Sequence, residues 1–207
     1  LIVGFLAIGI FSPEVAYQTE VKVNAPIEHA FSVFTDESKM GEWMIGFQSS
    51  EMMKGERFEV GSQFKLFIKQ EGDTVEIVET LTDFKENEQY AFDVDAKILT
   101  GHTDIRFSPD GAQTVIRSTN TARGNNMFWR SMFALFNDNF SKSAQKQYED
   151  LKVLIENTPL PKKEVQIVDN EAVHGFYITG NEVNTFQACG DTKVYCCLLY
   201  TSPSPRD

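Results

Sequence analysis

The sequence predicts an α+β fold in which a curved antiparallel β-sheet wraps around one long C-terminal α-helix, with two short helices after the first strand. The helix prediction rests on residues 126–157, where apolar side chains recur at spacings of three and four and so share one face. The residues before this segment alternate between apolar and polar, as half-buried strands do. A helix of this length spans about 45 Å and must lie across a broad surface, although the same pattern would suit a helix that fills a compact core. The apolar stripe consists of Trp129, Phe133, Phe136, Phe140, Ala144, Tyr148, Leu151 and Ile155.

The segments before the long helix predict one strand, two short helices and about six more strands. Residues 17–23 alternate between apolar and polar side chains and should form the first strand. Pro26 suits the first position of the next helix, and Glu28 places a carboxylate near its positive end. A second short helix is expected at 36–44, where Trp43 could line a ligand cavity or belong to an ordinary core.

Alternation and turn signals place the later strands. Val75 and Ile77 share one strand face, but the pattern then shifts to Val78 and Thr80, which predicts a bulge near Ile77. Bulges let a sheet curve around a helix. The sequence Ser-Pro-Asp-Gly at 108–111 favours the tight turn of a hairpin. The strands are expected at 47–53, 62–70, 74–84, 89–98, 102–107 and 113–121.

The charge of the chain limits the partners that it can bind. Asp and Glu number 30 and Lys and Arg number 19, which gives a formal net charge of −11. Binding to nucleic acid requires a Lys- and Arg-rich surface that neutralises phosphates, so we expect no nucleic-acid partner. The sequence has no Gly-rich phosphate-binding loop, no Cys-x-x-Cys pair and no His-Glu-x-x-His motif. It therefore predicts no cofactor and no metal site.

The chain opens on an unbroken apolar run without a charge, LIVGFLAIGIF. Because a bilayer-spanning helix needs about 20 apolar residues, we interpret residues 1–13 as the end of a truncated membrane anchor, with a membrane as partner. The apolar core of a signal peptide is the alternative. The next charged residues are Glu14 and Glu20, and no Lys or Arg precedes Lys22. This favours an extracytoplasmic position for the following domain, in a bacterial envelope.

The region after the long helix has a different character. Residues 158–163 contain two prolines and predict a linker. Residues 164–196 are strand-like and punctuated by glycines, and they weakly resemble small envelope-lipoprotein β domains. We interpret them as the start of a truncated small β domain, with a disordered tail as the alternative. Residues 197–207, CLLYTSPSPRD, resemble a translated sequencing adapter, so we expect them not to belong to the native protein.

Between residues 17 and 157 the order of motifs resembles that of a known superfamily. The resemblance is carried by Val23-x-Ala25-Pro26-x-Glu28-x-x-Phe31, by Asp36 and Trp43, by Val60-Gly61-Ser62, and by the helix from Trp129 to Ile155. The chain resembles the SRPBCC superfamily of START-like helix-grip domains, and within it the polyketide cyclase/dehydrase and lipid-transport branch. The resemblance implies a domain at 16–157 whose apolar cavity binds lipids, sterols, polyketides or other hydrophobic molecules. The Gly-rich loop of the plant branch is missing, so ligand recognition of the plant-hormone type is not implied.

An excess of aromatic and aliphatic residues supplies candidates for the wall of such a cavity. Apolar surface with few polar groups is typical of small-molecule sites, although the same residues can fill a core. We therefore expect a hydrophobic, lipid- or polyketide-like ligand between the sheet and the long helix. The candidate ligand-binding residues are Trp43, Phe64, Leu66, Tyr90, Phe92, Ile105, Phe107, Trp129, Phe133, Phe136 and Phe140.

Candidates for catalysis are fewer. His102, Asp104 and Arg106 share one strand face, with Glu76 and Glu79 nearby in the sheet. That face is opposite to the apolar one, so we expect it to be exposed to solvent and predict no catalytic residue. His29, on a helix with a surface pattern, and His174, beyond the linker, lack partners at metal-ligand spacing.

Three functions remain open. The first is a membrane-tethered, non-catalytic carrier or sensor of a hydrophobic molecule, and the second is a cyclase- or dehydratase-like enzyme that uses the same cavity. The third is a structural module. A large apolar void favours the carrier, a void with a buried His, Asp or Glu favours the enzyme, and a filled core favours the module.

Overall fold

The computed structural model describes residues 2–11, 14–70, 72–160, 175–179, 184–188 and 195–197. The chain divides into two compact units, Leu1–Pro161 and Lys162–Asp207. The prediction that residues 197–207 derive from an adapter falls, beyond Cys197, outside the described residues, as does His174.

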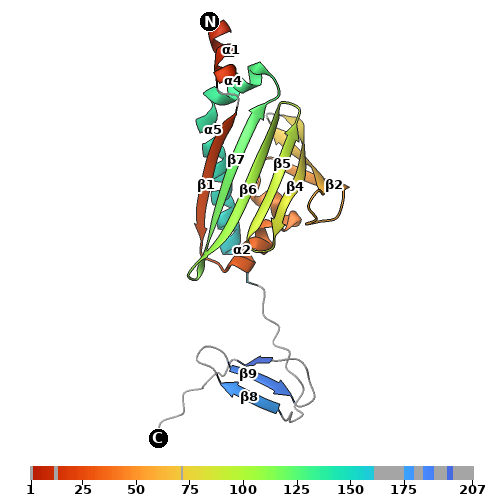
Figure 1. The fold of residues 1–207 in the computed structure, drawn as a ribbon, viewed down its shortest axis with the longest axis vertical. Coiled ribbons are helices and arrows are strands. Elements are labelled where there is room, and N and C mark those ends of the chain that lie inside the picture. Colours follow the sequence, from red (N-terminus) through yellow and green to blue (C-terminus); the bar gives the residue numbers. More distant parts are fainter. Residues whose placement is uncertain are drawn as a thin grey trace. The chain divides into compact units, whose positions relative to one another are not determined.

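The first unit is built on a curved antiparallel sheet of seven strands, as predicted (Figure 1). The strand order is β1-β7-β6-β5-β4-β3-β2, so only β1 leaves its place in the chain order, to pair with β7. Alternating β-branched and aromatic residues form these strands because such side chains pack well on a pleated surface. The strands are β1 (Val15–Val23), β2 (Phe47–Lys54), β3 (Gln63–Gln70), β4 (Asp73–Lys85), β5 (Gln89–Ala96), β6 (Leu99–Asp110) and β7 (Gln113–Gly124).

Helices connect the first two strands and follow the last one. The predicted short helices are present, and Asp36 caps the second by accepting a hydrogen bond from the Ser38 amide. Figure 1 shows the last helix of this unit running along the sheet beside β1. The helices are α1 (Ile2–Phe11), α2 (Ile27–Phe34), η1 (Glu37–Lys39), α3 (Met40–Trp43), α4 (Met127–Leu135) and α5 (Asn137–Asn157).

The long C-terminal helix is not continuous, which corrects the prediction of one helix over 126–157. It breaks at Phe136, whose φ of −106° and ψ of 16° end α4 before α5 begins. The break precedes Asn137, Asp138 and Asn139, whose short polar side chains compete for backbone hydrogen bonds and favour helix ends. Phe136 therefore leaves the buried stripe and is 45% exposed.

A bulge in β4 lies farther along the strand than the sequence indicated. The register between β4 and β5 shifts between Leu81 and Asp83, and the predicted bulge near Ile77 is absent. Ile77, Glu79 and Leu81 therefore stay on the inner face of the sheet, and the inner face passes to Phe84 only after the shift. Because the register shifts only after Glu79, the Glu79 side chain lies on the inner face of the sheet and not on the outer one.

The main core fills one end of the space between sheet and helix. Of the residues of α5, only Tyr148, Leu151 and Ile155 are buried, and all three lie in its second half. They pack in one cluster with α2 and the inner face of β6 and β7, where Leu151 and Ile116 are fully buried. The rings of Phe31 and Phe107 meet edge to face at 5.0 Å within this cluster.

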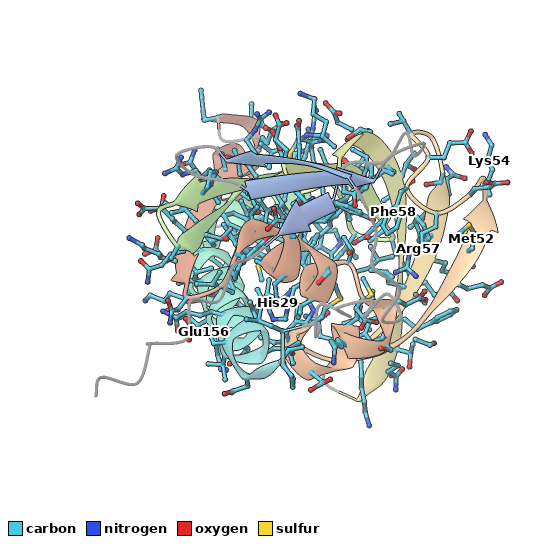
Figure 2. The ribbon with its side chains drawn as sticks, turned by 90° about the horizontal axis from the view of Figure 1, so that it is seen from below. His29, Met52, Lys54, Arg57, Phe58 and Glu156 are labelled. Atoms are coloured by element: carbon cyan, nitrogen blue, oxygen red, sulfur yellow. The ribbon has the colours of Figure 1, made fainter. Side chains whose placement is uncertain are left out.

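His29 is buried against the end of α5, so the prediction that it lies on a surface face is wrong. The side chain is only 5% exposed and lies toward α5 (Figure 2). Its Nε2 is 3.2 Å from the carbonyl oxygen of Ile155 and 3.1 Å from that of Thr158. Because carbonyl oxygens only accept, Nε2 carries the hydrogen and donates to carbonyls that the end of a helix leaves without partners.

The N-terminal helix α1 packs on α4. The amide of Gly9 donates to Ser131 Oγ at 3.0 Å, and a Cβ on Gly9 would lie 2.7 Å from the carbonyl oxygen of Met127, so this close approach requires glycine. The rings of Phe5 and Phe128 lie 5.6 Å apart. Among the described residues, no helix has both the length and the apolar character needed to span a bilayer.

The second unit contains a small antiparallel sheet of three strands in the order β10-β9-β8. The strands are β8 (Gly175–Thr179), β9 (Asn184–Ala188) and β10 (Tyr195–Cys197). β8, β9 and the first two residues of β10 lie within residues 164–196, the region expected to start a small β domain, whereas Cys197 lies in the stretch expected to derive from an adapter.

We predict that His29→Leu lowers the free energy of unfolding by about 1 to 3 kcal/mol, because it leaves buried carbonyls without a donor. His29→Gln keeps a donor and should recover part of this loss. The exposed His102 is the matched control, and His102→Leu should change stability by less than about 1 kcal/mol. Urea denaturation measures all three variants, and equal effects of the two leucine variants would contradict the role given to His29.

Candidate functional site

A cavity of about 370 Å³ lies between the inner face of the sheet and the first half of α5. Its wall is formed by β1, β3, β4, β5, β6 and β7, by the helices after β1, and by Phe140, Ala144 and Tyr148 of α5. The volume falls within the range of about 300–1,000 Å³ that is usual for small-molecule pockets. The space is therefore a candidate ligand site.

Most of the predicted ligand-binding residues line this cavity. They come from α3, from the inner faces of the sheet, and from α5, and they give the wall an apolar and aromatic character. Phe34 and Trp43 continue this surface, with ring centres 5.7 Å apart. The predicted residues in the wall are Trp43, Phe64, Leu66, Tyr90, Phe92, Ile105 and Phe140.

Four predicted residues lie outside the cavity wall. Phe107 points inward but belongs to the filled core, where it contacts Phe31. Trp129 and Phe133 stack with ring centres 6.0 Å apart on α4, and Phe133 meets the edge of Phe140 at 5.2 Å. Phe136 lies at the helix break and is exposed. Phe140 thus joins the aromatic side chains of α4 to the cavity.

Two carboxyl groups, Glu37 and Glu79, belong to this wall, and Glu79 is the one that lies on a strand of the sheet. In the sheet it pairs with Phe64 of β3 on one side and with Val94 of β5 on the other. Neither a hydrogen bond nor an ion pair reaches Glu79 from the part of the chain that the structure describes. Burial disfavours the charged form and raises the pKa of the Glu79 carboxyl from its ordinary value of 4.5 to about 7.

Neutral polar groups complete the deep part of the wall. Burial raises the pKa of the phenols of Tyr17, Tyr90 and Tyr148, and the nearby Glu79 raises that of Tyr90 and Tyr148 further. These phenols are therefore protonated and can donate hydrogen bonds. A short polar ladder lies beside them, in which Thr103 Oγ1 donates to Asn120 Oδ1 at 3.0 Å and Asn120 Nδ2 donates to Ser118 Oγ at 2.8 Å.

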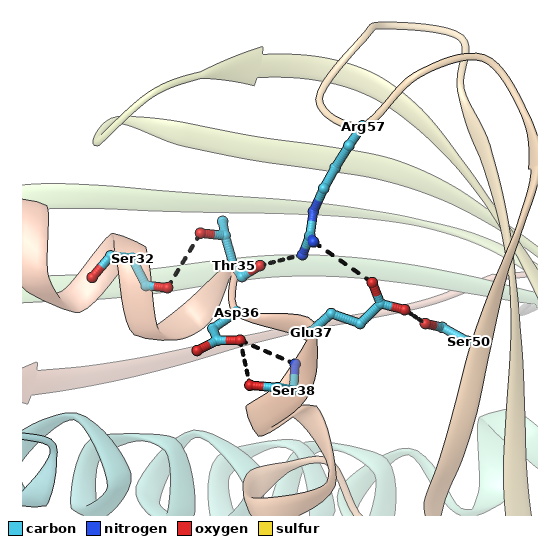
Figure 3. A network of polar contacts seen from close by, with 7 residues as sticks. All are labelled: Ser32, Thr35, Asp36, Glu37, Ser38, Ser50 and Arg57. Atoms are coloured by element: carbon cyan, nitrogen blue, oxygen red, sulfur yellow. Dashed lines mark hydrogen bonds and ion pairs between the residues drawn. The ribbon is translucent and has the colours of Figure 1, made fainter.

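The loop between β2 and β3 closes one side of the cavity with a network of polar contacts (Figure 3). Arg57 Nη2 donates to the carbonyl oxygen of Thr35 at 2.6 Å, and Nη1 lies 3.6 Å from Glu37 Oε2. Glu37 in turn accepts a hydrogen bond from Ser50.

Arg57 lies next to Phe58, with Met52 and Lys54 nearer the free edge of β2 (Figure 2). The guanidinium carbon of Arg57 lies 5.1 Å from the centre of the Phe58 ring, and Phe58 stacks on Phe84 at 4.8 Å. The only cation in the described wall of the cavity, Arg57, is thus already paired.

The candidate catalytic set does not converge on the cavity. Thr103 and Ile105 line the cavity, so the alternation along β6 places His102, Asp104 and Arg106 on the opposite, outer face. His102 Nδ1 lies 2.8 Å from Asp93 Oδ1, and Arg106 Nη2 lies 3.0 Å from Asp104 Oδ2. His102 borders a separate hollow on this face, which shares no lining residue with the cavity. Within the described residues, no group of three or more His, Cys, Asp or Glu side chains could hold a metal ion.

Sequence reasoning missed the polar part of the cavity. Glu79 was placed beside the outer His102, Asp104 and Arg106 because the bulge in β4 was placed too early. Tyr17 and Tyr148 were recognised as members of apolar stripes, but the stripe pattern does not show which members face a void. Arg57 lies in a loop without periodicity, so no sequence signal pointed to it.

We predict that the Glu79 carboxyl lowers stability as the pH rises from about 4.5 to about 7. The folded protein binds the proton more tightly than the unfolded chain, so its stability relative to Glu79→Gln falls across this window and is level above it. A rise in pKa of this size corresponds to about 3 kcal/mol at 1.36 kcal/mol per pH unit. Urea denaturation of both proteins from pH 4 to pH 8 measures the difference, and parallel stability curves would contradict a raised pKa of Glu79.

Comparisons with known proteins agree with this architecture. No curated protein matches the chain. The crystal structure of Ara h 8.0201 has a TM-score of 0.57 at 13% identity and covers 70% of this chain and 99% of its own. A conserved protein from Geobacillus kaustophilus has a TM-score of 0.58 at 14% identity, with 68% and 95% covered. The Zhui aromatase/cyclase from Streptomyces has a TM-score of 0.56 at 13% identity, with 69% and 94% covered.

These identities are low, so the structural likeness establishes the fold, which is the predicted helix-grip fold. The family described as "Polyketide cyclase / dehydrase and lipid transport" matches residues 14–155, which is well over half of the chain. The chain therefore belongs to the polyketide cyclase/dehydrase and lipid-transport family of the SRPBCC superfamily.

Proposed function

We propose that this domain binds a hydrophobic small molecule, lipid- or polyketide-like, in the cavity between the sheet and α5. The observation that carries the proposal is the cavity of about 370 Å³ with its aromatic and aliphatic wall. Apolar walls with a few placed polar groups favour hydrophobic ligands, because burial of apolar surface drives binding and the polar groups set the orientation. A structural module with a filled core would not contain this space.

Binding is a better account of the wall than catalysis. Cyclisation or dehydration by acid–base chemistry needs groups that exchange protons near neutral pH at more than one position of the substrate. Among the described residues of the wall, Glu79 alone has a pKa near neutrality, while Tyr17, Tyr90 and Tyr148 remain protonated. These groups can hold and orient a ligand. A cyclase- or dehydratase-like activity remains the second candidate because of this one carboxyl with a raised pKa.

We extend the proposal to a membrane tether at the N-terminus. Helix α1 has the sequence IVGFLAIGIF, with no charged residue, and Phe11 is 86% exposed. Helix α4, on which it packs, has no acidic residue and exposes Met127 and Phe128. A tether of this kind would hold the cavity close to a store of hydrophobic molecules. The absence of Lys and Arg before Lys22 supports an extracytoplasmic position for the domain.

The binding proposal is tested with the neutral fluorescent probe N-phenyl-1-naphthylamine. We expect its emission to rise and shift to the blue on addition of the protein, because the probe enters an apolar site. Ala144 lies in the cavity wall on α5, so Ala144→Trp places a large ring in the space. This variant should weaken probe binding at least about tenfold, a loss of about 1.4 kcal/mol.

Val153→Trp is the matched control, since Val153 lies on the same helix but is 56% exposed and outside the wall. It should bind the probe as the parent protein does. Circular dichroism shows whether both variants keep the fold. Absence of binding by the parent protein, or equal binding by both variants, would count against the cavity as the ligand site.

A further inference from the structure

We propose that the ligand is a lipophilic amine, or another hydrophobic organic cation, whose positive nitrogen pairs with Glu79 inside the cavity. This inference rests on the proposed function, since it names the chemical class of the molecule that the cavity binds. It is drawn from the distribution of charge over the cavity wall, which leaves one carboxylate without a partner.

The surroundings of Glu79 are apolar on every side that the sheet defines. Phe64 and Val94 are its neighbours across the strands, and Ile77 and Leu81 are its neighbours along β4 on the same face. Glu79 is half-buried, and such a position stabilises a carboxylate poorly, because a charge held among apolar groups requires a partner of opposite charge or hydrogen bonds. The fold supplies neither to Glu79 from the described residues. A bound cation would supply the first.

The other charged groups of the wall do not meet this need. Arg57, from the loop between β2 and β3, is engaged by Glu37 and by the carbonyl oxygen of Thr35, at the side of the cavity formed by that loop. The titratable groups that face the space from β1, β5 and α5 are the phenols of Tyr17, Tyr90 and Tyr148. Arg57 and Glu37 offset each other, so the described wall has a net charge of −1 when Glu79 is ionised.

This charge distribution discriminates among hydrophobic ligands of equal size. An amine brings the opposite charge into a site of low polarity, where ion pairing is stronger than in water. An alcohol can only exchange hydrogen bonds with Glu79 or the phenols. A fatty acid brings a second carboxylate next to the first, so one of the two must take up a proton before it binds. The expected order of affinity above neutral pH is amine, then alcohol, then acid.

The position of Glu79 also fixes the pH dependence. An alkyl amine keeps its proton throughout the range from pH 5.5 to pH 8, whereas burial places the pKa of the Glu79 carboxyl at about 7. Ionisation of Glu79 within this range should therefore strengthen amine binding and weaken binding of the fatty acid. The three phenols stay neutral in the same range and add no opposing change.

The test measures displacement of N-phenyl-1-naphthylamine at pH 5.5 and pH 8 by decylamine and decanoate, each below its micelle concentration, and by decanol below its solubility limit. At pH 8 we expect decylamine to bind at least about tenfold more tightly than decanoate, with decanol between them. Glu79→Gln should bring the three affinities within about threefold of one another and remove the pH dependence of decylamine binding. The control is Glu76→Gln, since Glu76 lies on the outer face of the same strand, 3.1 Å from Lys65. It should behave like the parent protein.

The outcomes separate this inference from the proposed function. Equal binding of the three compounds by the parent protein would overturn the amine assignment and leave hydrophobic binding intact, and so would a preference for decanol or decanoate. Loss of the amine preference in Glu76→Gln would show a surface charge effect and would also overturn it. Failure of the parent protein to bind the naphthylamine probe or any decyl compound would overturn the proposed function itself.

Discussion

The first unit depends on the packing of α5 against the sheet and α2, and the second half of this helix supplies all of its buried residues. Tyr148, Leu151 and Ile155 are the buried residues of this helix, and His29 holds its last carbonyl groups. Phe140 and Ala144, in the first half, face the cavity and do not fill the space between this part of the helix and the sheet. Because one end of the helix is packed against α2, β6 and β7, the other end can span a hollow without loss of the core. The cavity is thus a consequence of where the helix is fixed.

The wall of this cavity contains an unpaired carboxyl group, Glu79, which selection for stability alone would not favour. An apolar residue in place of Glu79 would suit its neighbours Phe64, Val94 and Ile77, and would avoid the cost of a buried carboxylate. Ionisable groups with shifted pKa values inside pockets are typical of functional sites. The cation of the loop, Arg57, is paired, whereas Glu79 lies unpaired among apolar strand residues. The uncompensated negative charge of the site is therefore confined to Glu79, and this is the basis for the ligand class that we infer.

Much of the fold could be predicted from the sequence, because alternation and helical spacing report directly on which face of an element is apolar. These patterns indicated the inward positions of Phe64, Phe92 and Ile105. They could not separate a cavity wall from a filled core, since Phe107 faces inward as well and is covered by Phe31 of α2. The place of the bulge in β4 also lay beyond the pattern, because the pairing of β4 with β5 sets it. Glu79 was therefore not recognised as part of the site.

We propose that the cavity beneath α5 holds a hydrophobic molecule in the native protein. Native mass spectrometry of the full chain, purified from its cells without added ligand, can detect such a molecule. We expect a protein species with the added mass of a small molecule that organic solvent extracts, and we expect that Ala144→Trp, purified in the same way, lacks this species. An unliganded mass for both proteins, or the same adduct on both, would contradict this proposal.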